Sequence, residues 1–249
     1  MKKFSLFSKL SLGSLFFAAS MMAGTASASL VTMEFNNGDS LADWNVDRAA
    51  PQGFEIINNE LVMTVAGELN QDNFRNTQGM IMDIGESNYL SIDMYVDSAW
   101  NQDGRYGGLW GVANLANGDR ANEYPILEFQ RDSTGVTGIA KWESGPGWII
   151  PPSSLFNLDA FNTLVLSINN GMYEYFVNGN MIHQAAATAD HLGSVILNGY
   201  NTLSAPNNDG YQVRYDNLTY GTTSVSAPSM FALLLTAFAF VASRRFLRK

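Results

Sequence analysis

The stretch FNTLVLSINNGMYEYFVNG, residues 161–179, decides the fold. Its first half places Leu164, Leu166 and Ile168 at every second position, which is the period of a β-strand with one buried face. Asn169-Asn170-Gly171 then separates this strand from the next, and Asn178-Gly179 ends the second strand. Because Asn and Gly tolerate positive φ, Asn-Gly is a strong hairpin signal. The stretch predicts two antiparallel strands with a third following at 181–184.

The same period of two recurs along the chain, most clearly over 61–65, 89–96 and 211–215. After Tyr215 the apolar phase shifts, which predicts a β-bulge near Asn217. One segment, Ala185–Leu192, has the composition of a short helical turn. We therefore expect an all-β fold, an antiparallel β-sandwich of the jelly-roll kind with about a dozen short strands.

Composition excludes several protein classes. The chain has 249 residues, of which 46% are hydrophobic, 12% aromatic and 15% charged, and it has no cysteine. A charged fraction below the usual value of about 25% disfavours coiled coils, and the many aromatic residues exclude global disorder. The lack of cysteine excludes a disulfide scaffold, a thiolate zinc site and a cysteine nucleophile.

Residues 1–28 have the three parts of a secretory signal peptide. Lys2, Lys3 and Lys9 form a basic region, Leu10–Ala23 is apolar, and Ala26-Ser27-Ala28 is a small-residue cleavage site. An uncleaved N-terminal membrane anchor is the alternative, and the shortness of the apolar region disfavours it. We expect cleavage between Ala28 and Ser29, and hence export.

Residues 222–249 have the pattern of a sorting tail. Val225-Ser226-Ala227-Pro228 precedes an expected membrane helix over 229–243, and Arg244 and Arg245 begin a basic cluster. This order resembles the PEP-CTERM signal of Gram-negative bacteria that make exopolysaccharide, although Ala227 replaces the usual Glu. The resemblance implies a precursor anchored transiently in the inner membrane, an exosortase-type processing enzyme, and delivery to the cell surface or extracellular matrix. A plain C-terminal membrane anchor is the alternative.

The body between these ends is strongly acidic. Seven of the 14 basic residues lie in the two terminal segments, whereas all 23 acidic residues lie within 34–216. Seven basic and 23 acidic side chains give the body a formal charge of −16. We therefore expect no nucleic acid partner and no basic patch for anionic lipid, while neutral glycans and cations remain suitable ligands.

The hairpin stretch resembles the paired strands of concanavalin A-like lectin/glucanase domains, the laminin-G-like group included. The opening FNNGD (35–39) with Asp43-Trp44, and the closing YDNL (215–218), are similar to the first and last strands of such domains. The resemblance covers most of residues 30–221 and implies one lectin-like jelly-roll domain over 29–221. Galactose-binding-like carbohydrate modules have similar opening and closing phrases and stay as the alternative fold.

The resemblance to a glucanase superfamily raises hydrolysis as an activity. Family-16 glycoside hydrolases of this fold carry Glu-x-Asp-x-x-Glu on one strand, whereas EYPILEF (123–129) lacks the central Asp. Glu123 and Glu128 are five residues apart, so on one extended strand they leave on opposite faces, with Cα atoms about 17 Å apart. That separation does not suit a hydrolytic carboxylate pair. We expect no catalytic residues, although carboxylates that pair across strands would escape this argument.

Metal sites have little support in the sequence. His183 and His191 are eight residues apart and match no metal or catalytic-triad spacing. The resemblance to jelly-roll lectins implies a structural Ca²⁺ site, for which Asp39 and Asp216 are the candidate ligands. The sequence has no Asp-x-Asp-x-Asp-Gly loop. Solvated turn carboxylates are therefore the stronger interpretation, and no cofactor is required.

Aromatic side chains are the candidate carbohydrate-binding residues, because sugar rings stack their C–H faces on flat side chains. Five of them gather in the middle third of the chain: Tyr106, Trp110, Tyr124, Trp142 and Trp148. Alternation puts Tyr106 and Trp110 on one strand face with Gly108 between them. Core packing is the competing interpretation for each, since a sandwich core needs large side chains.

Together these features predict an exported surface or matrix protein that binds a polysaccharide without cleaving it. The ligand that the tail's resemblance implies is the exopolysaccharide of the producing cell. Two alternatives stay open, a structural matrix protein without a saccharide site and a glycoside hydrolase.

Overall fold

Fourteen strands run through the residues that the structure, a computed structural model, describes: 28–67, 77–100, 105–131, 137–140, 155–201 and 210–223. In chain order they are β1 (Ser29–Met33), β2 (Asn45–Val46), β3 (Gly53–Ile57), β4 (Glu60–Val65), β5 (Gln78–Ser87), β6 (Tyr89–Val96), β7 (Arg105–Asn114), β8 (Ile126–Arg131), β9 (Thr137–Ala140), β10 (Ala160–Asn169), β11 (Met172–Val177), β12 (Asn180–Ala186), β13 (His191–Asn201) and β14 (Tyr211–Thr222).

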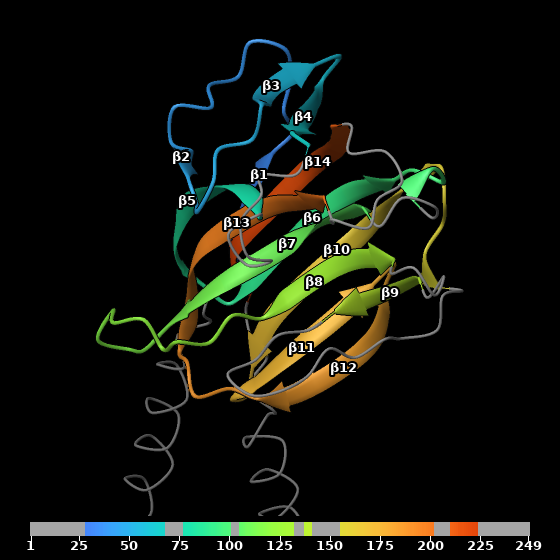
Figure 1. The fold of residues 1–249 in the computed structure, drawn as a ribbon. Coiled ribbons are helices and arrows are strands. Elements are labelled where there is room, and N and C mark those ends of the chain that lie inside the picture. The colour runs from blue at the N-terminus through green and yellow to red at the C-terminus, as the bar shows by residue number, and fades with distance from the viewer. Residues whose placement is uncertain are drawn as a thin grey trace, which may run out of the picture. The chain divides into compact units, whose positions relative to one another are not determined.

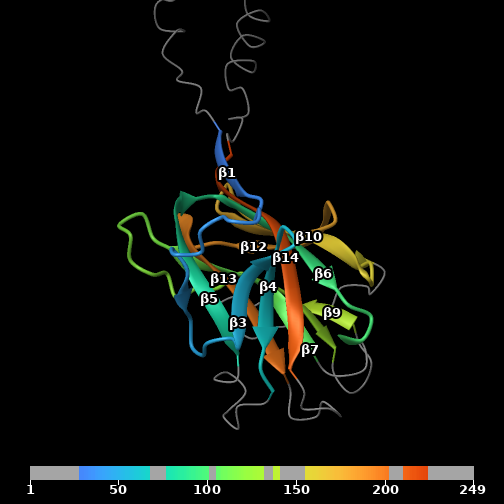
Figure 2. The ribbon, with the colours of Figure 1, turned by 90° about the horizontal axis from the view of Figure 1, so that it is seen from above.

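The strands form two sheets. One has eight strands in the order β12-β11-β10-β6-β14-β4-β3, with β1 also pairing to β14, and the other has six in the order β2-β5-β13-β7-β8-β9. The strand pairs are antiparallel. Figures 1 and 2 show the two sheets lying over one another. This arrangement confirms the predicted antiparallel β-sandwich.

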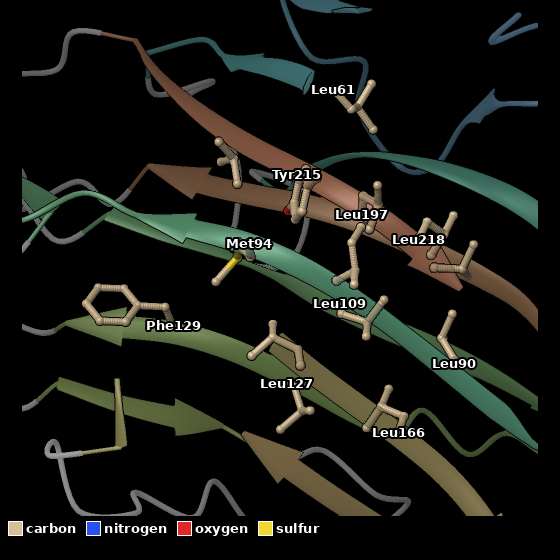
Figure 3. Close-up of a cluster of buried hydrophobic side chains, with 14 of the residues drawn as sticks. Leu61, Leu90, Met94, Leu109, Leu127, Phe129, Leu166, Leu197, Tyr215 and Leu218 are labelled. Carbon is tan, nitrogen blue, oxygen red and sulfur yellow. The ribbon is translucent and has the colours of Figure 1, made fainter. Parts of the chain in front are cut away.

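The core lies between the sheets, because each strand turns its apolar side inward. In β6, for example, Leu90, Ile92, Met94 and Val96 are fully buried. Figure 3 shows such side chains from both sheets in one layer, among them Met94 of the larger sheet and Leu109 of the smaller one. Burying this much apolar surface is the main force that holds the two sheets together.

The predicted hairpins and bulge are confirmed. β10 pairs with β11, and β11 with β12, across turns in which Asn170 and Asn178 have φ of 50° and 49°. In β14 the pairing to β6 shifts register between Asp216 and Thr219, and Asn217 has φ of 51°.

The predicted helical turn at Ala185–Leu192 is wrong. Ala185 and Ala186 end β12, and His191 and Leu192 begin β13. Ala185 pairs with Tyr173, and the Asp190 amide donates to the Asn114 carbonyl at 2.8 Å. Pairing with two neighbouring strands therefore outweighs the weak helix propensity of a short alanine-rich stretch.

The predicted sorting segments lie outside the described residues, apart from Ala28 and residues 222–223 at the two edges. This holds for the expected helix at 229–243 and for the tail residues Val225, Pro228, Arg244 and Arg245. Ser29 is the first residue of β1. Among the described residues, no helix has the length and apolar character needed to cross a membrane.

Candidate functional site

The six-stranded sheet buries apolar side chains on both faces. Its inner face supplies Leu109 and Leu127 to the core between the sheets. Its other face, which we call the outer face, carries a separate buried cluster of Trp110, Val112, Ile126 and Ile196, with Ile81 and Tyr124 packed against it. Because alternate residues of a strand leave on opposite faces, Gly108 and Glu128 also lie on the outer face.

Glu128 of β8 is a buried carboxylate on this outer face, with 4% of its surface exposed. Its Oε1 accepts hydrogen bonds from Trp110 Nε1 at 2.5 Å and from Asn198 Nδ2 at 2.6 Å. Trp110 lies on β7, the strand next to β8 in the sheet, and Asn198 lies on β13, the strand beyond β7. Hydrogen bonds to a charged acceptor are stronger than neutral ones, so these donors stabilise negative charge on the Glu128 carboxylate.

A glycine makes room for this arrangement. Gly108 lies between Glu128 and Asn198 in the sheet register. A Cβ atom at Gly108 would lie 2.5 Å from Glu128 Cγ and 2.5 Å from the Leu127 carbonyl oxygen. The missing side chain at residue 108 therefore lets Glu128 reach across β7 to the amide of Asn198.

The opposite sheet holds the backbone beneath the site. Tyr215 of β14 is fully buried, and its hydroxyl lies 2.9 Å from both the Gly108 and the Asn198 carbonyl oxygens, to either of which it donates. Burial raises the pKa of Tyr215 well above its usual value, so the phenol keeps its proton. The two residues beside Glu128 are thus fixed from across the core.

Asp47 and Arg48 reach the outer face from the segment after β2. Arg48 Nη2 lies 2.7 Å from Asp47 Oδ2, and the Arg48 guanidinium carbon lies 4.2 Å from the centre of the Trp110 ring. Burial raises the pKa of Asp47, and the charges of Arg48 and Arg120 oppose that rise. Burial lowers the pKa of Arg48, and the charges of Asp47 and Glu128 oppose that fall. Arg48 therefore feels the field of two carboxylates.

These residues could carry out acid–base chemistry. Glu128 is held by N–H donors, whereas burial pushes Asp47 toward its protonated form. Two carboxyl groups in different environments on one sheet face are groups that could serve as a base and an acid. Asn198 adds an acceptor, because its Oδ1 is buried and accepts no hydrogen bond from the described residues.

The predicted aromatic residues occupy different environments. Trp110 is 8% exposed, and the Arg48 guanidinium lies over its ring, so the ring is not an open platform for sugar stacking. Tyr124 is half-buried against the outer-face cluster. Tyr106 is half-buried and meets Tyr200 edge to face, with ring centres 5.2 Å apart. Trp142 and Trp148 lie outside the described residues.

Glu123, which precedes β8, has a structural role on the inner side of the sheet. Its carboxylate accepts hydrogen bonds from the Tyr173 hydroxyl at 2.6 Å, the Thr188 hydroxyl at 2.6 Å and the Thr188 amide at 3.3 Å. Burial would raise the pKa of Glu123, but these bonds outweigh it and lower the pKa. Glu123 precedes β8 and contacts Tyr173 of the opposite sheet, whereas Glu128 lies on the outer face, so the two do not form a pair.

The two calcium candidates, Asp39 and Asp216, lie in different environments. Asp39 caps a turn by accepting from the Asn36 amide at 2.8 Å. Asp216 lies on β14, where burial raises its pKa and its own side chain accepts from the Asn217 amide. Within the described residues, no three His, Cys, Asp or Glu side chains are grouped so as to hold a metal. Calcium binding stays a prediction.

Sequence reasoning missed Asp47, Arg48 and Asn198. Asn198 had a local signal, since it interrupts the apolar run Val195–Leu197 with an amide. Asp47 and Arg48 had none, because their position depends on the pairing of β2 with β5 and on contacts with β7, which lies far along the chain.

No family model matches the sequence, and neither does any curated protein. Solved structures do match in fold. A Bacillus licheniformis β-glucanase is 10% identical with a TM-score of 0.52, covering 78% of this chain and 99% of that one. The laminarinase catalytic domain of Thermotoga petrophila RKU-1 is 14% identical with a TM-score of 0.56, covering 78% and 98%. The laminarinase of Flavobacterium sp. UMI-01 is 12% identical with a TM-score of 0.55, covering 78% and 100%.

These matches contradict the expectation of a non-catalytic polysaccharide-binding protein, since all three matched structures are named as glycan-cleaving enzymes. The expectation rested on the absence of a carboxylate motif from one strand. Chain segments far apart in sequence bring Asp47, Arg48 and Glu128 to one sheet face. The chain shares the concanavalin A-like jelly-roll fold of these glucanase and laminarinase structures.

Proposed function

We propose that this chain is a glycoside hydrolase in which Glu128 is a catalytic carboxylate. The observation that carries the proposal is the buried Glu128 side chain, held on the outer sheet face by Trp110 Nε1 and Asn198 Nδ2. A carboxylate acts in such enzymes as a base or as a nucleophile toward the anomeric carbon. The fold it shares with glucanases and laminarinases supports the same reaction class.

The substrate class we propose is a polysaccharide. The matched structures are named for glucans and laminarin, and this is the chemistry to try first. The alternate positions before Glu128 on the outer face are Ile126 and Tyr124, neither of which is a carboxylate. A second catalytic carboxylate must therefore come from outside β8.

Two matched glutamine variants test the proposal. The full chain and its E128Q and E123Q variants are incubated with laminarin and with mixed-linkage β-glucan, and released reducing ends are measured. E128Q should lower the rate by about 10²- to 10⁴-fold, the usual contribution of an acid–base group. E123Q should keep the rate, since Glu123 lies on the inner side of the sheet. Equal rates for E128Q and the parent chain, or no release from any glycan, would overturn the proposal.

We propose further that the chain reaches its substrate outside the cell. This rests on the signal-like residues 1–28, the expected cleavage between Ala28 and Ser29, and the tail pattern at 222–249. Its precursor would be held in the inner membrane, processed by an exosortase-type enzyme, and released to the surface or matrix. Mass spectrometry of the exported protein tests both cleavages, because a mature chain that still contains the tail would contradict the processing step.

A further inference from the structure

Five Asn-Gly pairs place the same reactive chemistry in different surroundings of the molecule. In such a pair the backbone nitrogen of the glycine can attack the asparagine Cγ and expel the side-chain nitrogen as ammonia, and glycine has no Cβ to obstruct the attack. Side-chain hydrogen bonds and burial hinder this reaction, because they hold the amide in place. The pairs, all within the described residues, are Asn37-Gly38, Asn117-Gly118, Asn170-Gly171, Asn178-Gly179 and Asn198-Gly199.

Asn37 and Asn117 are exposed but are held by hydrogen bonds. Asn37 Oδ1 accepts from the Asn59 amide at 3.2 Å. Asn117 Nδ2 donates to Asp119 Oδ2 at 2.8 Å, and its Oδ1 accepts from the Asp119 amide at 3.1 Å. The Gly118 nitrogen, which would have to attack, donates to a carbonyl of the same turn at 2.8 Å. Reaction at either asparagine therefore requires hydrogen bonds to break first.

Two further asparagines are held more tightly. Asn178 Oδ1 accepts from the Thr163 amide at 3.0 Å, and its Nδ2 donates to the Leu155 carbonyl at 2.8 Å. Asn198 lies within β13, is 1% exposed and donates to Glu128. The glycine that follows Asn198 belongs to the same strand and pairs with both neighbouring strands. Reaction at Asn198 therefore requires the sheet to open.

Asn170 differs from the other four asparagines. It is exposed in the turn between β10 and β11, and its side chain forms no hydrogen bond within the described part of the chain. Gly171 is exposed as well, and a Cβ built on it would have no atom within 4 Å. Asn170 and Gly171 have φ of 50° and 73°, the signs of a two-residue hairpin turn. Exposed turns of this kind open locally at a small cost in free energy.

We propose that Asn170 is a site of spontaneous modification, at which the side-chain amide becomes a carboxyl group. The Gly171 nitrogen bonds to Asn170 Cγ and gives its proton to solvent, while the Cγ–Nδ2 bond breaks and the nitrogen takes up a proton and leaves as ammonia. Water then opens the cyclic imide. Breaking its bond to Cγ yields aspartate, and breaking its bond to the main-chain carbonyl carbon yields isoaspartate. One water is consumed and one ammonia released, with no change in oxidation state.

The two products have different consequences for the hairpin. Aspartate tolerates positive φ as asparagine does, so it keeps the turn. Isoaspartate adds its Cβ to the main chain, whereas a two-residue turn fixes the pairing of Asn169 with Met172. The Gly171 carbonyl also accepts from the Ala187 amide at 2.9 Å, which ties the turn to the end of β12. We therefore expect isoaspartate to lower the melting temperature and N170D, which reproduces the other product, to keep it.

The test compares the folded full chain with the same chain unfolded in urea, both kept at mildly alkaline pH. Mass spectrometry of the peptides follows the conversion of each Asn-Gly pair. In urea the five pairs should convert at similar rates, because only the local sequence acts. In the folded chain Asn170 should convert about 10-fold or more faster than Asn117 or Asn178, since two side-chain hydrogen bonds must break at each of the latter.

Two variants serve as matched controls. D119A removes the acceptor of Asn117 Nδ2, so it should speed conversion at Asn117 and leave Asn170 unchanged. N170G keeps a residue suited to positive φ and should abolish the first acidic form seen on ion exchange, because each conversion adds one negative charge.

Three results would overturn the inference. The first is a folded chain in which another Asn-Gly pair converts before Asn170. The second is a folded chain in which Asn170 stays intact while it converts in urea, which would show that the hairpin protects it. The third is an N170G chain that acquires the acidic form as fast as the parent chain. None of these results depends on hydrolase activity.

Discussion

Trp110 binds Glu128 through a hydrogen bond of 2.5 Å from the indole Nε1 to the carboxylate Oε1. The same indole ring lies under the Arg48 guanidinium. One side chain therefore contacts both an acidic and a basic group of the proposed site. Its N–H and its ring face have separate roles, which substitution can separate.

Replacing Trp110 by Phe removes the N–H donor and keeps an aromatic ring for Arg48. We expect W110F to lower kcat/KM by about 10- to 100-fold, because a hydrogen bond to a charged group contributes about 1.5–3 kcal/mol. Reducing-end assays on glucan measure this. The control is W44F, since Trp44 Nε1 is buried and has no hydrogen bond partner among the described residues. W44F should keep full activity. Equal losses of kcat/KM in W110F and W44F would show that altered packing, and not the lost hydrogen bond, causes the effect.

Glu123 should make stability depend on pH. Its pKa is lowered in the folded state, so its hydrogen bonds add stability above the unfolded-state pKa of about 4.3 and lose it as pH falls through the folded-state value. We expect E123Q to cost about 1–3 kcal/mol at pH 7 and to flatten the loss of stability below about pH 4.3. Urea unfolding at a series of pH values measures both. A parallel pH profile for the two proteins would contradict the assignment.

Adding one methyl group at residue 108 should disturb the site. In G108A the new Cβ would meet Glu128 Cγ and the Leu127 carbonyl, and backbone cannot move aside as a side-chain end can. We expect a loss of about 1–3 kcal/mol together with reduced glucan cleavage. G53A is the matched control, because its nearest neighbour is Thr64 Oγ1 at 3.3 Å in the other sheet. Unchanged activity in G108A would show that Glu128 does not depend on this spacing.

The charge of the body predicts a preference among substrates. Residues 29–223 carry seven basic and 23 acidic side chains, a formal charge of −16. An anionic glycan should therefore associate more slowly than a neutral one of the same backbone, and added salt should reduce the difference because the Debye length falls to about 3 Å at 1 M. Laminarin and its carboxymethyl derivative, assayed at low and high salt, test this. Faster cleavage of the anionic form at low salt would contradict it.

The sandwich could be predicted from the sequence because its signals are local. Leu164, Leu166 and Ile168 alternate within one strand, and Asn170 and Asn178 adopt the positive φ that their turns require. The bulge at Asn217 was also predictable, because the alternation of apolar residues changes phase within a few residues of it. The period of a strand and the type of its turns depend on residues close in sequence, so a single sequence is enough to predict them.

The candidate site could not be predicted because its contacts join different strands across the sheet. Glu128 meets Asn198 only after β7 has come between their strands, and Arg48 reaches Trp110 from a position 62 residues earlier in the chain. Register across a sheet depends on tertiary packing, which alternation within a strand does not specify. For the same reason, the absence of a one-strand motif says little about which polar residues share a sheet face.

The hydroxyl of Tyr215 belongs to β14, which is the final strand and lies between β4 and β6 in the larger sheet. Gly108 and Asn198 are therefore fixed only when that strand has inserted. Contacts between residues this far apart in sequence form late and slowly during folding. A ribosome must thus release nearly the whole domain before Glu128 acquires its final surroundings, so an incomplete chain with most of the β-structure would still lack the finished site.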